Sequence, residues 1–118
     1  MITLSGNPLS TQHIYGISCR GKYALRYLTA KAKVRKEQYQ WEAKTQWKGK
    51  ILEGLLVADI KLYFKDKRVH DWDNYHKLSM DSLEGIVYKN DNQIYDSRVR
   101  RFLDRENPRI EVNIKTMT

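Results

Sequence analysis

The sequence lacks the features that mark secreted and membrane proteins. Among its 118 residues there is one cysteine, Cys19, which excludes a disulfide framework and a cysteine-rich zinc site. No run of about eighteen apolar residues is present. The chain does not open with a basic segment followed by an apolar one, the pattern of a signal peptide. We therefore expect a protein that crosses no membrane and works in a reducing cytoplasm.

Histidine is also scarce, and its spacing excludes a common zinc motif. His13, His70 and His76 form no His-Glu-x-x-His pair, so the helical zinc site of many metalloproteases is absent. His70 stands beside the acidic stretch described below. We expect it to be solvated or to hydrogen-bond a metal ligand; the alternative is that it binds a metal there directly.

Positive charge is what the chain has in excess, and it is concentrated in one block. The net charge is +8, from 22 Lys and Arg against 14 Asp and Glu. The block from Cys19 to Lys50 alone has a net charge of +8, so the rest of the chain is neutral. Tyrosines and tryptophans interleave the block, as in proteins that bind nucleic acid. The alternative is a solvated basic face, and the block does not distinguish DNA from RNA.

Apolar spacing predicts an α+β fold, in one domain that spans residues 1–118. The predicted strands are 1–5, 23–28, 55–64, 93–103 and 109–115, with an extended arm as the alternative for the second. The predicted helices run from a cap at Thr29 to about Trp47 and from Asn74 to Ile86. Residues 9–21 are predicted to be a loop and 88–92 a polar turn. We expect a mixed β-sheet packed by the two main helices.

The first predicted helix has apolar residues on more than one side. Ala30, Val34 and Trp41 share one side of a helical wheel. The other side carries Ala32, Tyr39, Ala43 and Trp47. Either a second subunit or a large core within one chain would cover such a helix.

The stretch from His70 to Lys77 carries the strongest chemical signal. Asp71 and Asp73 lie two residues apart, so an extended chain can point both carboxylates to one side. If Asp73 caps a helix that starts at Asn74, Lys77 stands one turn above it. Carboxylate oxygens suit a hard cation such as Mg²⁺, and a lysine beside them suits an anionic substrate. The alternative is an ordinary helix cap with a surface ion pair.

Asp91, in the predicted polar turn, is a candidate third carboxylate. The second helix separates the acidic stretch from this turn, so both could lie at one end of the sheet. The alternative is a plain turn aspartate.

Two motifs together resemble the RusA family of Holliday-junction resolvases. The first is Asp71-x-Asp73-Asn74-x-x-Lys77, and the second is Asn90-Asp91-x-Gln93-Ile94 after the helix. Pro8-x-Ser10 also resembles the family's Pro-Ser-x-Asn loop, and the last strand has the expected place. Gln12, Asn90 and His70 stand where the family often has asparagine, an acidic residue and arginine.

The resemblance implies a fold, an activity and residue roles. It implies a small homodimeric endonuclease that uses Mg²⁺ or Mn²⁺ to cut four-way DNA junctions symmetrically, in recombination and repair. It assigns the metal ligands to Asp71, Asp73 and Asp91 and the catalytic lysine to Lys77, so all four are candidate catalytic residues. We expect the DNA contacts to come from Lys31, Lys33, Arg35, Lys36, Lys67 and Arg68. The alternative function is a non-catalytic nucleic-acid binder whose acidic stretch is only a helix-cap network.

Overall fold

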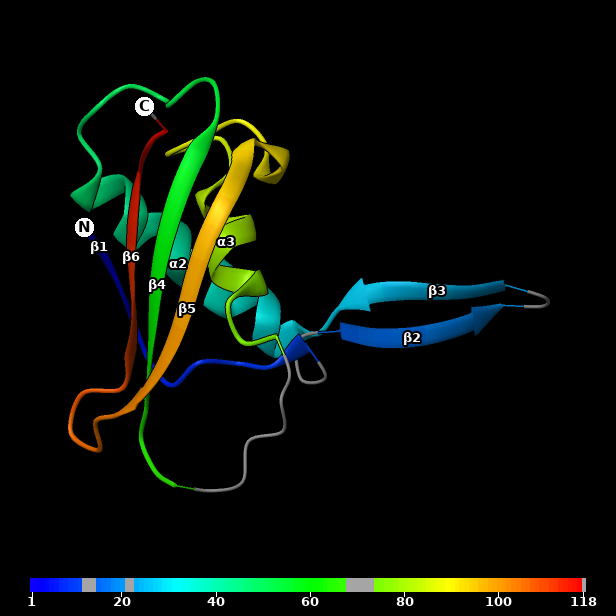
Figure 1. Cartoon of the computed structure of the whole chain (residues 1–118). Helices are drawn as coiled ribbons and strands as arrows, with labels where there is room; N and C mark the ends of the chain where they lie inside the picture. The colour runs from blue at the N-terminus through cyan, green and yellow to red at the C-terminus, as the bar shows by residue number, and fades with distance from the viewer. Residues whose placement is uncertain (12–14, 21–22, 68–73, 118) are drawn as a thin grey trace.

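A mixed four-stranded sheet, with strand order β1-β6-β4-β5, forms the body of the protein (Figure 1). The computed structural model describes residues 1–11, 15–20, 23–67 and 74–117. The strands are β1 (Ile2–Ser5), β4 (Leu56–Phe64), β5 (Ile94–Leu103) and β6 (Arg109–Thr116). β4 pairs antiparallel with β6 and parallel with β5. The mixed sheet and its four strands are confirmed as predicted.

Strand β4 organises the core because its side chains alternate strictly between two faces. Leu56, Ala58, Ile60, Leu62 and Phe64 are all buried, while the residues between them are half-buried. Alternation is what a pleated strand imposes. Burial of each large aliphatic side chain contributes about 1.5–3 kcal/mol.

Both helices, α2 (Ala30–Gln46) and α3 (Lys77–Leu83), cover the same face of the sheet (Figure 1). α2 starts where predicted, since the Thr29 hydroxyl accepts a hydrogen bond from the Ala32 amide at 3.2 Å. Among the described residues, no helix is long and apolar enough to cross a membrane. The sheet's other face carries pairs such as Asp59–Arg100, 3.1 Å apart, and no described helix covers it.

The two-sided pattern of α2 is present, but within the part of the chain that the structure describes only one side is covered. Ala32, Tyr39 and Ala43 are buried against the body. Val34 and Trp41 are 67% and 68% exposed on the outer side. The core of one chain therefore accounts for half of the pattern.

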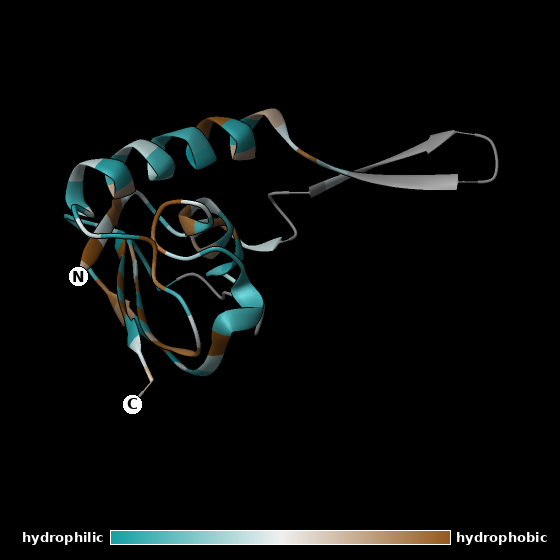
Figure 2. Cartoon of the chain, turned by 90° about the horizontal axis from the view of Figure 1, so that it is seen from above, coloured by the Kyte–Doolittle hydropathy of each residue, from teal (hydrophilic) through white to brown (hydrophobic). Residues whose placement is uncertain are grey.

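Residues predicted to be a loop form part of a hairpin. β2 (Tyr15–Arg20) pairs antiparallel with β3 (Tyr23–Leu28), and the pair projects away from the body (Figure 1). β3 leads into α2, the largely hydrophilic helix along one side of the body in Figure 2. The second strand was predicted; the first was not. Gly16 lies opposite Tyr27, and a Cβ on Gly16 would lie 2.4 Å from the tyrosine ring. A larger residue at position 16 would require the Tyr27 ring to move, and a glycine inside a strand weakens the strand pattern in the sequence.

The second predicted helix is shorter than expected. The helix begins at Lys77, and its N-cap residue, His76, makes no capping side-chain hydrogen bond. The predicted start at Asn74, with Asp73 as the cap, is therefore wrong. The helix ends at Leu83 because Gly85 has a φ of +83°, the left-handed conformation that terminates helices.

Residues 88–92 are not simply a polar turn. Tyr88 is fully buried, and its hydroxyl donates to the Met80 carbonyl at 2.5 Å. A short 3₁₀ helix, η1 (Asp91–Gln93), then leads into β5. The apolar anchor at Tyr88 fixes the position of this polar segment against α3.

Candidate functional site

Three carboxylates converge between the end of α3 and η1. Asp81, Glu84 and Asp91 each offer an oxygen, and these oxygens all lie within 4.8 Å of one another. Asp81 and Glu84 are three residues apart, which places them on one side of the helix end. The Asp91 amide donates to the Glu84 carboxylate at 3.3 Å, which ties η1 to the helix. We call Asp81, Glu84 and Asp91 the acidic cluster.

Lys77 supplies a positive charge at the border of the acidic cluster. Its ammonium lies 3.3 Å from one Asp81 oxygen and donates to the other at 3.4 Å. A cation at the first residue of a helix opposes the helix dipole. The contact with Asp81 offsets that cost locally.

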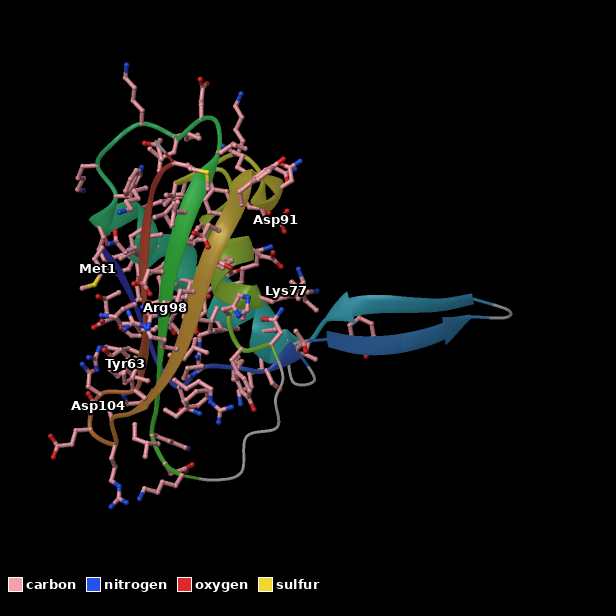
Figure 3. The ribbon with its side chains drawn as sticks, in the orientation of Figure 1. Met1, Tyr63, Lys77, Asp91, Arg98 and Asp104 are labelled. Atoms are coloured by element: carbon pink, nitrogen blue, oxygen red, sulfur yellow. The ribbon has the colours of Figure 1, made fainter. Side chains whose placement is uncertain are left out.

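Lys77 and two members of the acidic cluster, Asp81 and Asp91, line a cleft of about 230 Å³, which we call the α3–β5 cleft. Its polar wall contains Asn74, His76, Lys77, Asp81 and Asp91. Its apolar floor contains Ala58, Ile60 and Ile94, beside Ser97 of β5. Figure 3 shows Lys77 and Asp91 beyond the β5 edge of the sheet, with Asp91 nearer the start of that strand. Anionic and cationic side chains therefore share one recess over an apolar floor.

Burial and charge set the protonation of two groups beside the cleft. Burial lowers the pKa of His76, and the nearby Lys77 charge lowers it further, so the imidazole is neutral at pH 7. Burial raises the pKa of Tyr88, and Glu84, Asp81 and Asp91 raise it further. The acidic cluster thus creates a negative potential, the condition that favours a bound cation.

Of the predicted catalytic residues, the structure brings together Lys77 and Asp91, which line the same cleft. Asp71 and Asp73 lie outside the described residues, as do Arg68 and His70. Asn74, the residue after Asp73, does line the α3–β5 cleft.

The polar turn enters β5 at the end of the sheet where β4 begins, since Ile94 pairs with Leu56. Phe64, which leads toward the acidic stretch, lies at the opposite end beside Leu103. Because parallel strands require this crossover, α3 returns along the sheet. Lys77 and Asp91 therefore line the same cleft beside β4 and β5, although the segments that lead to them start from opposite ends of the sheet.

The residues predicted to contact DNA differ in their exposure to solvent and in their hydrogen bonds to the rest of the chain. Lys31, Lys33 and Lys67 are exposed, and Lys36 is half-buried. Arg35 instead donates to the Asn7 carbonyl at 2.7 Å and the Tyr39 hydroxyl at 3.2 Å. Arg35 therefore holds the N-terminal segment against α2.

Sequence reasoning missed Asp81 and Glu84 as candidate ligands. A signal was present, because Lys77, Asp81 and Glu84 follow one another at intervals of four and three residues. His76, which also lines the cleft, had no comparable signal.

Comparison with known proteins identifies a family that matches nearly the whole chain. The family described as endodeoxyribonuclease RusA matches residues 6–115. The chain is also 28% identical over 137 aligned positions to the uncharacterized protein YqaN of Bacillus subtilis (strain 168), an alignment that covers 98% of this chain and 95% of that protein. The family match includes the whole acidic cluster and Lys77.

Proposed function

The chain belongs to the endodeoxyribonuclease RusA family, whose members resolve Holliday junctions, and we propose that it does so as a divalent-metal-dependent homodimer in DNA recombination and repair. The observation that carries the metal-dependent part is the acidic cluster beside Lys77 in the α3–β5 cleft. A cleft that combines carboxylates with an ammonium group suits chemistry on a phosphate.

The donor chemistry fits Mg²⁺ or Mn²⁺. Both ions prefer oxygen ligands, and Mg²⁺ commonly uses only one or two carboxylates and retains water. Asp91 is exposed while Asp81 and Glu84 are half-buried, so a bound ion would keep open positions toward solvent. We propose that Asp91 holds the ion with Asp81 or Glu84, and that Asp71 and Asp73 complete the site from the acidic stretch. A bound divalent ion supplies an activated water and neutralises charge on the phosphate.

The ammonium group of Lys77 can serve two roles in phosphodiester hydrolysis. Its ammonium can hold a non-bridging phosphate oxygen, where negative charge grows in the transition state. It can also donate a proton to the leaving oxygen. The salt bridge to Asp81 keeps the Lys77 ammonium at the border of the acidic cluster, within reach of a phosphate bound there.

A basic surface for DNA includes the first part of α2. Residues 1–36 contain seven cations and no aspartate or glutamate, and four of those cations lie on α2. Lys31 and Lys33 are exposed. Such a surface attracts phosphates without reading sequence.

The homodimer rests on the need for two cuts. A four-way junction is resolved by paired incisions in symmetric strands, and a two-fold assembly supplies two identical sites. Val34 and Trp41, exposed on the outer side of α2, offer one contact surface. An exposed strand edge is the other.

The direct test is cleavage of a synthetic four-way junction by the purified protein. We expect paired linear products with Mg²⁺ or Mn²⁺ and none with EDTA. Asp91→Asn should abolish cutting, while Asp96→Asn, an exposed carboxylate outside the cluster, should not. Junction binding without any cleavage in either metal would support the non-catalytic alternative and overturn the proposal.

A further inference from the structure

A second, larger recess borders η1, and its lining does not include the residues of the acidic cluster. It has a volume of about 580 Å³ and lies between residues 53–55 and the segment from Lys89 to Tyr95. We call it the Tyr95 pocket. The residues used here are Glu53, Leu55, Asn90, Asn92 and Tyr95.

The walls of the Tyr95 pocket are held in place by Gln93. Its side-chain amide donates to the carbonyls of Leu52 and Gly54, at 3.1 and 3.0 Å. Its oxygen accepts from the amides of Lys89 and Asn90, at 2.9 and 3.0 Å. One side chain therefore joins both walls, so the pocket is formed before any ligand binds.

The lining has the chemistry of nucleobase recognition. Tyr95 is 69% exposed and Leu55 is 45% exposed, which leaves apolar surface available for contact. Aromatic rings stack on bases whatever their sequence. Asparagine amides and carboxylates hydrogen-bond base edges, so Asn92, Asn90 and Glu53 can distinguish one base from another.

The position of the pocket couples it to the proposed chemistry. Asn90 and Asn92 immediately flank Asp91, whose carboxylate belongs to the acidic cluster. A nucleotide with its phosphate at the acidic cluster therefore has its base next to the pocket. We propose that the Tyr95 pocket receives an unstacked nucleobase beside the scissile phosphate and sets the base preference of cutting, an inference that rests on the proposed endonuclease function.

The test compares cutting rates on junctions that differ only in the base beside the cut. With wild-type protein we expect single-turnover rates that depend on that base. Because stacking on Tyr95 would hold the base where Asn92 and Glu53 contact its edge, Tyr95→Ala should shrink the ratio between best and worst base by about tenfold or more. Asn92→Ala should change the order of preference. Asn90 and Gln93 are left intact because they form the capping box of η1.

Two controls and one optical measurement separate the outcomes. Asn113→Ala and Phe102→Ala change an amide and a ring that do not line the pocket, and should keep the wild-type preference. In EDTA, 2-aminopurine beside the cut should change its fluorescence on binding wild type, and Tyr95→Ala should remove that change.

The outcomes also separate this inference from the proposed function. No cutting by wild type in either metal would overturn the proposed function, while the optical signal would still report on the pocket. Cutting that ignores the neighbouring base, or a preference unchanged in both pocket variants, would overturn the pocket inference and leave the endonuclease intact.

Discussion

The Lys77 ammonium lies 3.3 Å from the Asp81 carboxylate, one helical turn further along α3. Both side chains are about a third exposed, at 33% and 27%, so solvent screens the pair. As a surface pair it contributes only about 0.2–0.5 kcal/mol. Its location is more informative, because Asp81 also belongs to the acidic cluster. The pair places a cation where a phosphate would meet the cluster.

Lys77→Ala should therefore lower the rate of the chemical step far more than it lowers junction affinity. Loss of a transition-state contact of this kind costs about 10²-fold or more in single-turnover rate. Binding is measured in EDTA and cutting at saturating enzyme. If Lys77 were only the ion-pair partner of Asp81, stability would fall by a few tenths of a kcal/mol and the rate would not change.

Removing one carboxylate at a time should separate metal binding from folding. Asp71→Asn, Asp73→Asn and Asp91→Asn should abolish cleavage at nearly constant side-chain volume, and Glu84→Gln should weaken Mn²⁺ binding in calorimetric titrations. Junction binding in gel shifts should persist or tighten, since a negative charge near the phosphates is lost. Asp96→Asn serves as the matched control. Near wild-type cutting by both Asp71→Asn and Asp73→Asn would reject the metal ligands assigned to the acidic stretch.

The elements that were predicted well are those whose pattern is local. β4 and β6 alternate because one of their faces is buried, and Thr29 caps α2 through a bond to its own first turn. β2 was missed because hydrogen bonds to β3 define it, while Gly16 carries no side chain to mark it. The length of α3 depended on Gly85 and on Tyr88, a buried anchor within an apparently polar turn.

The candidate site was predicted in part for the same reason. Lys77 and Asp91 belong to short motifs that can be read in sequence. Their neighbourhood depends on distant contacts: Gln93 bonds to Leu52 and Gly54, 41 and 39 residues away. Those hydrogen bonds hold η1 in place, and they thereby keep the Asp91 carboxylate close to those of Glu84 and Asp81. Sequence spacing alone contains no such information.

Tyr88→Phe should lower the stability of the protein without changing any of the proposed metal ligands. The variant leaves the Met80 carbonyl without its 2.5 Å hydrogen bond in a buried position, which costs about 1–3 kcal/mol. Urea unfolding at pH 7 measures this loss. Equal stability of the two proteins would show that another group satisfies the carbonyl.

Tyr88 also predicts a pH dependence at the alkaline end. Its pKa is raised in the folded protein, mainly by burial. The folded state therefore keeps this proton more tightly than the unfolded state. The resulting stability is full below the ordinary tyrosine pKa of about 10 and is lost as pH rises toward the folded value. Tyr88→Phe should show a flatter fall in unfolding free energy above pH 10. An identical fall would assign the effect to Tyr39, whose pKa burial also raises.

The basic surface should appear in the salt dependence of junction binding. Log affinity should fall with log salt by about 0.9 for each duplex phosphate neutralised. Changing Lys31, Lys33 and Lys36 together to glutamine should flatten that slope. Arg35→Gln should instead lower stability, because its guanidinium donates to Asn7 and Tyr39. A triple variant with the wild-type slope would show that these lysines face away from DNA.

Paired cutting should require two intact sites in one assembly. Each chain has one acidic cluster among its described residues, and resolution needs two incisions in strands related by near two-fold symmetry. Mixed dimers of wild-type and Asp91→Asn chains should nick one strand and release few paired linear products. Mixed dimers with Asn113→Ala, which lies outside the cluster, should resolve the junction normally.

The contact surface of that dimer can be tested on α2. Sedimentation should report about twice the 14.1 kDa chain mass at assay concentration. Val34→Lys combined with Trp41→Lys places charges on two exposed apolar positions. If these residues meet their copies across the two-fold axis, the like charges repel and the protein becomes monomeric, with folding unchanged in thermal melts. The monomer should then nick without paired cutting. A variant that stays dimeric would move the contact to a strand edge, while a wild-type monomer that resolves junctions would require one site to cut twice in sequence.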